Sequence, residues 1–278
     1  MDVVLAGLSG QVERPQTQKF AWPIVMLPDL FTTRRHLAML LGYFASIGWE
    51  VYALDLHVPA HESDRRPAWR DFAGMLAAVE DARATLERDA IIMGHGLGGL
   101  LALKLAERPH VRAAVALAPL VPGFASPLFM SARNRLARWL GRSLKPPTGK
   151  MLFELIADAD AFQRDTIIRT LVPGASASAR EVARGAIDFS REPPAHRLIV
   201  AGDVDIFAPA DRMTRFAETI GARLLMLQGR GHWLISGRVL ERVVAETQRF
   251  LVRTLGQELL LLYPDELKDT NGSKGGDA

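Results

Sequence analysis

The sequence predicts an α/β fold: a mostly parallel sheet flanked by helices, with a group of helices inserted between its two halves. Short apolar runs alternate along the chain with longer amphipathic stretches, a pattern of strands alternating with helices. The short runs are apolar throughout, which is typical of parallel strands covered on both faces. The alternation stops between about residues 121 and 192, where only helical segments are expected, and then resumes.

In the first half, strands are expected at residues 23–27, 50–55, 89–93 and 111–117. Between them, helical spacing of apolar residues predicts helices at 34–48, 69–88 and 97–107. The first of these helices is expected to stop at Gly48, because glycine commonly ends helices. Each strand is thus followed by a helix, as a parallel sheet requires.

The second half contains the insertion and the end of the sheet. Helices are expected at 127–141, 151–156, 159–171 and 175–189, with proline pairs at 146–147 and 193–194 as breaks. A strand at 197–201, a helix at 209–220, a strand at 223–227 and a helix at 237–255 follow. We therefore expect a core formed by residues 1–120 and 193–263, a helical cap or lid at 121–192, and a flexible polar tail at 264–278.

Composition limits the class of protein. With 278 residues, 49% of them hydrophobic, and a mean hydropathy of +0.08, the chain can bury a sizeable core. The absence of cysteine excludes disulfides, thiolate metal sites and cysteine nucleophiles. Residues 113–132 lack charge, but prolines interrupt them, so no membrane span is expected, and without a signal-peptide pattern we expect a cytoplasmic protein.

The net charge of +3 is too small to suggest a nucleic-acid partner. One stretch is nevertheless densely basic. It contains Arg133, Arg135, Arg138, Arg142, Lys145 and Lys150. We interpret it as the solvated face of an amphipathic helix, with binding of acidic groups as the alternative.

The most informative segment is 94–99, Gly-His-Gly-Leu-Gly-Gly, which joins the predicted strand 89–93 to the helix at 97–107. A glycine-rich strand-to-helix turn of the form G-x-S-x-G is a nucleophile elbow, in which the central residue adopts a positive φ. Here the central residue is Gly96 rather than serine.

With this turn, the chain from about Pro23 to Leu255 resembles the α/β-hydrolase superfamily. In the segment 202–209, Gly-Asp-Val-Asp-Ile-Phe-Ala-Pro, the resemblance places Asp205 as the orienting carboxylate. The segment Gly231-His232-Trp233 resembles the histidine loop, and the order elbow, acid, histidine is the order of this family. The insertion falls where the family carries its cap.

Two departures from the family pattern stand out. Gly96 has no hydroxyl and glycine tolerates positive φ, so the turn should survive while the acyl-enzyme chemistry is lost. In the family, the residue in the position of His95 normally points away from the site. After the first predicted strand, the family usually has His-Gly where this chain has Pro28-Asp29.

The resemblance implies an oxyanion hole formed by the backbone N–H groups of Leu30 and Leu97. For Asp29 we favour a solvated or turn-capping carboxylate over one at the pocket mouth.

The resemblance makes His232, oriented by Asp205, the candidate catalytic group, with Trp233 beside it as a pocket candidate. A histidine held by a carboxylate can act as a general base near neutral pH. We therefore expect action on a small, largely apolar carbonyl compound, ester or polycyclic metabolite, through activated water, a lyase or cyclase step, or cofactor-free oxygenation. No cofactor is expected. If the remaining geometry is intact, Gly96→Ser should restore labelling by serine-directed fluorophosphonates.

Two further features of the sequence concern metal binding and dimer formation. His57 and His61 are separated by Pro59, which breaks the helix that metal-binding spacing would need, so no metal is expected, although His57 could line the pocket. The apolar run 259–263 could form a homodimer contact.

Three alternative interpretations remain. The segment 94–99 also fits the G-x-G-x-x-G dinucleotide pattern, but it follows three strands, and 114–120 contains no acid. A non-catalytic ligand- or partner-binding protein, or an esterase inactivated by an introduced serine-to-glycine change, would also lack the serine.

Overall fold

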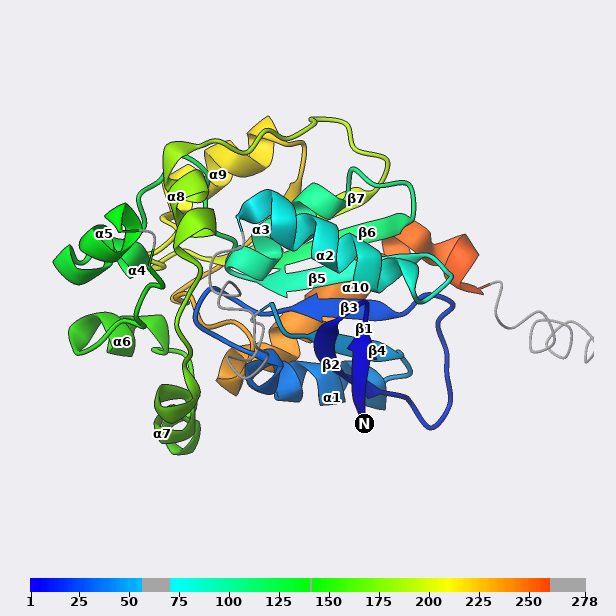
Figure 1. The fold of residues 1–278 in the computed structure, drawn as a ribbon. Helices are drawn as coiled ribbons and strands as arrows, with labels where there is room; N and C mark the ends of the chain where they lie inside the picture. The colour runs from blue at the N-terminus through cyan, green and yellow to red at the C-terminus, as the bar shows by residue number, and fades with distance from the viewer. Residues whose placement is uncertain (57–70, 141, 261–278) are drawn as a thin grey trace, which may run out of the picture.

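The computed structural model describes residues 1–56, 71–140 and 142–260, and these residues form an eight-stranded sheet flanked by helices (Figure 1). The order of the strands across the sheet is β1-β2-β4-β3-β5-β6-β7-β8. Their bounds are β1 Asp2–Leu5, β2 Leu8–Glu13, β3 Ile24–Leu27, β4 Val51–Leu54, β5 Ala90–His95, β6 Val111–Leu117, β7 His196–Gly202 and β8 Arg223–Leu227. The α/β fold with a mostly parallel sheet predicted from the sequence is confirmed.

The six strands from β3 to β8 pair in parallel, and β1 and β2 extend the sheet in antiparallel orientation. This first hairpin was not predicted from the sequence. Its signal is modest: β2 alternates buried Leu8, Gly10 and Val12 with more exposed residues, and Ala6 and Gly7 form the tight turn with positive φ angles of 45° and 82°. The hairpin extends the sheet beyond β4 and forms one of its edges.

Helices cover both faces of the sheet (Figure 1). Helices α2 (Phe72–Ala84) and α3 (Leu97–Leu105) pack together on one face, and α1 (Ala38–Ser46) and α10 (Leu240–Leu260) pack together on the other. Helix α9 (Ala210–Thr219) contacts β7 and β8. The predicted helix at 34–48 begins as a 3₁₀ turn, Arg34–Leu37, and the predicted helix at 69–88 is described from residue 71 onward.

Between β6 and β7 the described residues form helices and a single isolated bridge between Leu144 and Gly174, but no strand of the sheet. The helices are α4 Pro127–Met130, α5 Ala132–Trp139, α6 Lys150–Leu155, α7 Ala161–Thr170 and α8 Ser176–Arg184. The predicted helix at 127–141 is divided, because Ser131 has an extended backbone (φ −54°, ψ 149°). In Figure 1 these helices lie at the left, beyond the end of the sheet toward which β5 points.

The central strands are the core of the molecule. Every residue of β3, β4 and β5 is buried, so these strands are covered on both faces as their continuous apolar sequence predicts. Loops that leave the carboxyl ends of such strands emerge from a rigid base, and this is where parallel sheets place ligand sites. Among the described helices, none combines the length and apolar character needed to cross a bilayer.

Candidate functional site

The turn from β5 to α3 has the backbone of a nucleophile elbow. Gly96 has φ 52° and ψ −113°, a conformation in which L side chains are strained. Its N–H donates to the carbonyl of Leu117 at 3.0 Å, and its carbonyl accepts from the N–H of Leu100 at 3.1 Å. Gly98 lets α3 approach β3 closely, because a Cβ there would lie 2.7 Å from the carbonyl carbon of Leu27. These glycines therefore allow the turn.

The loop that follows β3 carries Asp29 toward this elbow. Its backbone is fixed by Thr32, whose hydroxyl accepts from the N–H of Asp29 at 2.8 Å and whose N–H donates to the carbonyl of Asp29 at 3.0 Å. Because the hydrogen bonds of this turn use the backbone of Asp29, its side-chain carboxylate is available to bind groups outside the turn. The sequence predicted a solvated or turn-capping carboxylate, and because Asp29 is only 2% exposed, the prediction of a solvated carboxylate is wrong.

The carboxylate of Asp29 lies where the side chain of an elbow residue would be. A Cβ added to Gly96 would lie 2.7 Å from Oδ2 of Asp29, and closer still to Oδ1 and Cγ. Oδ1 accepts a hydrogen bond of 2.7 Å from the N–H of Leu97, the group expected to form one half of the oxyanion hole. Asp29 thus fills the space of the missing side chain and binds one of the predicted oxyanion donors.

The predicted acid and histidine meet at the same place. Asp205, in the loop after β7, accepts from the N–H of Phe207 at 2.7 Å through Oδ1, and its Oδ2 lies 2.8 Å from Nδ1 of His232. On the other side of the ring, Nε2 of His232 lies 3.4 Å from Oδ2 of Asp29. The imidazole is therefore held between two carboxylates, and the side chains of His232 and Asp205 are fully buried.

This arrangement fixes the charge of the two central groups. Burial alone would lower the pKa of His232, but the charge and hydrogen bond of Asp205, with those of Asp29, raise it to about 10. Burial would raise the pKa of Asp29, but the hydrogen bond and charge of His232 lower it to about 2. At neutral pH the cluster therefore contains an imidazolium beside an ionised Asp29.

His95 lies against this cluster rather than away from it. Its ring centroid is 4.9 Å from that of His232, and its Nε2 lies 2.8 Å from the backbone carbonyl of His232. Burial, together with the positive charge of His232, lowers the pKa of His95 to about 4. The neutral ring therefore donates through Nε2, and its buried Nδ1 has no hydrogen-bond partner among the described residues. His95 thus supports the backbone of the histidine loop.

A metal site is the alternative interpretation of Asp29, His95 and His232. Asp29, His95 and His232 offer ligand atoms within 4.8 Å of one another. However, Nε2 of His95 is used by the backbone carbonyl of His232, and each ring nitrogen of His232 already faces a carboxylate, Nδ1 that of Asp205 and Nε2 that of Asp29. The donor set therefore fits an ion-pair network better than a metal site.

A cavity of about 380 Å³ lies close to the histidine loop. Its walls come from α7, from the 3₁₀ turn and start of α1, and from Trp233, the residue after His232. Met39, Phe162 and Ile167 make much of the lining apolar. Trp233 is 1% exposed and its indole N–H donates to Ser236 at 2.7 Å, so its ring is held in place beside this cavity.

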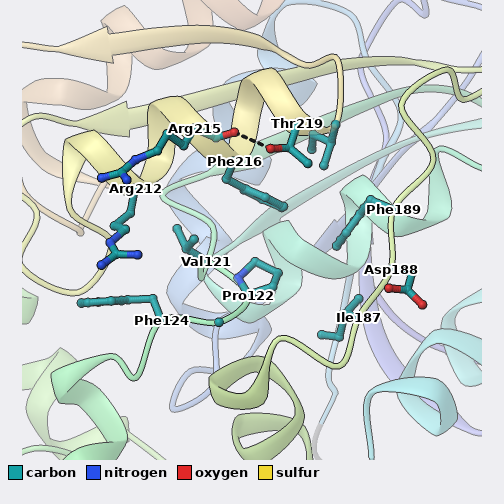
Figure 2. Close-up of a pocket in the computed structure, with 12 residues that line it drawn as sticks. Val121, Pro122, Phe124, Ile187, Asp188, Phe189, Arg212, Arg215, Phe216 and Thr219 are labelled. Carbon is teal, nitrogen blue, oxygen red and sulfur yellow. Dashed lines mark hydrogen bonds between the residues drawn. The ribbon is translucent and has the colours of Figure 1, made fainter.

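A second cavity, of about 420 Å³, lies apart from the Asp29 cluster (Figure 2). It is bounded by the chain entering the insertion, including Val121 and Phe124, by the chain leaving it, including Ile187, and by helix α9. Figure 2 shows Arg212 and Arg215 at one end and Phe189 toward the other. None of the side chains of the Asp29 cluster lines this cavity.

The candidate site residues divide into those that lie together and those that lie outside the described residues. Gly96, Leu97, Asp29, His95, Asp205, His232 and Trp233 lie together, and Leu30, expected to share the oxyanion hole, is buried next to Asp29 in the chain. His57 and His61 lie outside the described residues, as does most of the run 259–263. The missed relation is that of Asp29 to Gly96. The sequence signal for it was a pair of changes from the family pattern: an aspartate at position 29, where the family has glycine, and a glycine at position 96, where the family has serine.

Comparisons with known proteins support the fold. An esterase of Thermogutta terrifontis is similar over 91% of this chain and 99% of its own, with a TM-score of 0.68 at 18% identity. A monoacylglycerol lipase of Paleococcus ferrophilus is similar over 86% and 97%, with a TM-score of 0.66 at 21% identity. A carboxylesterase of Nitrososphaera gargenis is similar over 92% and 100%, with a TM-score of 0.63 at 15% identity.

These structural likenesses show the fold alone. No curated protein sequence matches the chain. The sequence profile of the alpha/beta hydrolase family, however, matches residues 21–246, which include β3, the elbow, the acid loop and the histidine loop. The chain is a member of the alpha/beta hydrolase family.

Proposed function

We propose that this protein is an enzyme that lacks the serine nucleophile and uses the carboxylate of Asp29 in its place, served by the His232–Asp205 pair. The observation that carries the proposal is the position of Asp29. One of its oxygens accepts from Leu97 and the other faces Nε2 of His232, in the space of the elbow side chain. A carboxylate can be a covalent nucleophile, and an ionised one needs no base for its attack.

The charges of the cluster support a definite order of events. Because His232 is protonated at rest, it is a proton donor in the first step and a base only afterwards. Oδ2 of Asp29 attacks a carbon that bears an oxygen leaving group. A bond forms between Oδ2 and that carbon, the bond to the leaving oxygen breaks, and this oxygen takes the Nε2 proton of His232. The general base expected from the sequence therefore belongs to the second step.

In the second step, water attacks Cγ of Asp29 and gives its proton to the now neutral His232. The oxyanion that develops on Oδ1 is stabilised by the N–H of Leu97, which already binds that oxygen. Collapse releases the substrate carbon as an alcohol, which takes the remaining proton, and regenerates the carboxylate. Loss of the charge on Asp29 in the adduct supports this step, because it removes one of the two carboxylates that raise the pKa of His232.

The apolar cavity beside Trp233 favours a small, largely apolar substrate, such as a strained cyclic ether. We assign the helices α4 to α8 the role of a cap over the site. Asp29 is 2% exposed and His232 1%, so the substrate reaches them only after a movement of the surrounding elements.

The test follows the oxygen of the attacking water. In a single turnover in H₂¹⁸O, label should enter the side chain of Asp29 and be found by mass spectrometry of its peptide. A panel of phenyl-substituted epoxides provides the substrates. Asp29→Asn, which keeps the shape of the side chain, should abolish turnover, whereas Asp203→Asn, a nearby acid outside the cluster, is the matched control. Turnover in Asp29→Asn, or label confined to the product, would overturn the proposal.

A second candidate is a non-catalytic protein that binds a ligand or partner. It is favoured by the burial of Asp29, His232 and Asp205, which interact with one another rather than with a cavity. Against it, three buried ionisable groups are a costly way to stabilise a core, and perturbed pKa values concentrate at functional sites. This candidate would be favoured if no compound of the panel is turned over and if binding of these compounds is the same in Asp29→Asn as in wild type.

The same geometry weighs against an introduced serine-to-glycine change. A serine at position 96 would place its Cβ within the carboxylate of Asp29. Gly96 and Asp29 therefore fit each other, whereas serine and Asp29 in these positions do not.

A further inference from the structure

The exposed face of helix α5 has an unusual composition. Leu136 is 57% exposed, Trp139 80% and Leu140, which follows the helix, 44%. Positions 136, 139 and 140 are three and four residues apart and therefore lie on the same side of a helix. A surface helix of a globular protein normally turns such a stripe toward the core. This apolar stripe is turned outward.

The opposite side of α5 is anchored by a polar residue. Asn134 is 1% exposed, its side-chain amide donates to the carbonyl of Lys145 at 3.0 Å, and its side-chain oxygen accepts from the N–H of Lys145 at 3.0 Å. These bonds hold the helix to the chain that follows it. The outward direction of Leu136 and Trp139 is therefore fixed by the fold.

Basic residues border the apolar stripe. With 3.6 residues per turn, Arg133 and Arg135 fall on its two sides, and both are exposed. Arg142, Lys145 and Lys150, also exposed, follow in the chain, and residues 108–153 contain no aspartate or glutamate. The positive charge of this region is thus not offset by acids in the same stretch.

We propose that α5 is a docking surface for the anionic surface of a lipid bilayer. An outward apolar stripe with a tryptophan, bordered by arginines, is suited to the boundary between lipid headgroups and acyl chains, where Leu136 and Trp139 bury apolar surface and the arginines meet lipid phosphates. A nucleic acid would use the arginines but would leave the leucines in water. In Figure 1, α5 lies at the outer edge of the molecule with no element beyond it. This proposal is independent of the chemistry at Asp29.

The experiment uses the full chain and unilamellar vesicles of phosphatidylcholine, either alone or with ~30% phosphatidylglycerol, which gives a strongly negative surface. Co-sedimentation should show binding to the anionic vesicles, weak binding to the neutral ones, and loss of binding in high salt. Arg133→Gln with Arg135→Gln should weaken binding roughly tenfold or more. Arg242→Gln with Arg249→Gln, an exposed pair on α10, is the matched control and should have no effect.

The apolar stripe has its own test. Leu136→Gln with Trp139→Gln should abolish binding to anionic vesicles, whereas Val204→Gln, at a position 60% exposed, should not. The fluorescence of wild type should shift to the blue on vesicle binding, and the Trp139→Gln protein should lack this shift. Equal binding to neutral and anionic vesicles would overturn the proposal, as would binding unchanged in either α5 variant. Equally tight binding to heparin or DNA without the blue shift would also overturn it and indicate a soluble polyanion as the partner.

Discussion

Placing a serine at position 96 tests whether Asp29 occupies the position proposed for the nucleophile. In Gly96→Ser, the new Cβ would overlap the carboxylate of Asp29, so Asp29 must leave Leu97 and His232. A side chain at φ 52° costs about 1–2 kcal/mol, and breaking a buried ion pair costs about 3–5 kcal/mol. We therefore expect Gly96→Ser to lower the free energy of unfolding by on the order of 5 kcal/mol. The unaided restoration of labelling expected from the sequence is revised accordingly.

The double variant Asp29→Gly with Gly96→Ser removes the obstruction and restores the residue types that the family has at both positions. The N–H of Leu97 becomes available to an oxyanion, and His232 keeps only Asp205, so its pKa should fall toward neutrality. This variant should react with a fluorophosphonate probe and release nitrophenol from nitrophenyl esters.

The assay compares four proteins: wild type, each single variant and the double variant. Urea unfolding should show the double variant to be more stable than Gly96→Ser, with a coupling of at least about 1 kcal/mol. Gel fluorescence should show labelling in the double variant alone, and His232→Gln added to it should abolish the labelling. Equal labelling of Gly96→Ser and the double variant would refute the reasoning, because Asp29 would then not obstruct the serine.

Three further predictions concern stability. The raised pKa of His232 contributes to the free energy of unfolding, and this contribution is complete below about pH 6.5 and lost as the pH rises through about 10. Between these pH values, urea titrations should show the unfolding free energy of wild type falling more steeply than that of His232→Gln, by up to about 1.4 kcal/mol per pH unit. Asp205→Asn leaves the imidazolium with one carboxylate and should cost roughly 3–5 kcal/mol, whereas unchanged urea midpoints would contradict the pairing. Gly98→Ala should lower the melting temperature, because its Cβ would meet the backbone of Leu27, and a melting temperature equal to that of wild type would show that α3 can move.

Much of the fold could be predicted from the sequence, because the strands are continuously apolar and the helices are amphipathic. Strand β5 lies within one or two residues of its expected bounds, and α9 within one. The first hairpin was missed because β1 is only four residues long and partly exposed, so its pattern is weak. The division of the helix expected at 127–141 depends on the backbone of Ser131, which no periodicity indicates.

The sequence indicated the elbow, Asp205 and His232 as candidate site residues, but it did not favour a position for Asp29 among them. Elbow, acid and histidine could be found because each follows a strand at a fixed place in the family order, and the structure places them together. The role of Asp29 could not be found, since a carboxylate in a turn is commonly solvated or caps that turn. Its position depends on three-dimensional space: Gly96 leaves a gap, and Asp29 fills it from 67 positions earlier in the chain (96 minus 29).

The charge state of His232 is the most direct test of the central claim, because burial alone would lower its pKa, whereas an imidazole held between Asp29 and Asp205 would remain protonated in the interior of the protein. ¹⁵N NMR of protein labelled at histidine reports the protonation of both ring nitrogens as the pH is raised. We predict that His232 carries protons on both nitrogens at pH 8 and titrates at about 10, and that Asp29→Asn lowers this pKa. A neutral His232 at pH 8, titrating at or below its ordinary value of 6.5, would contradict the claim that Asp29 faces it in place of the nucleophile.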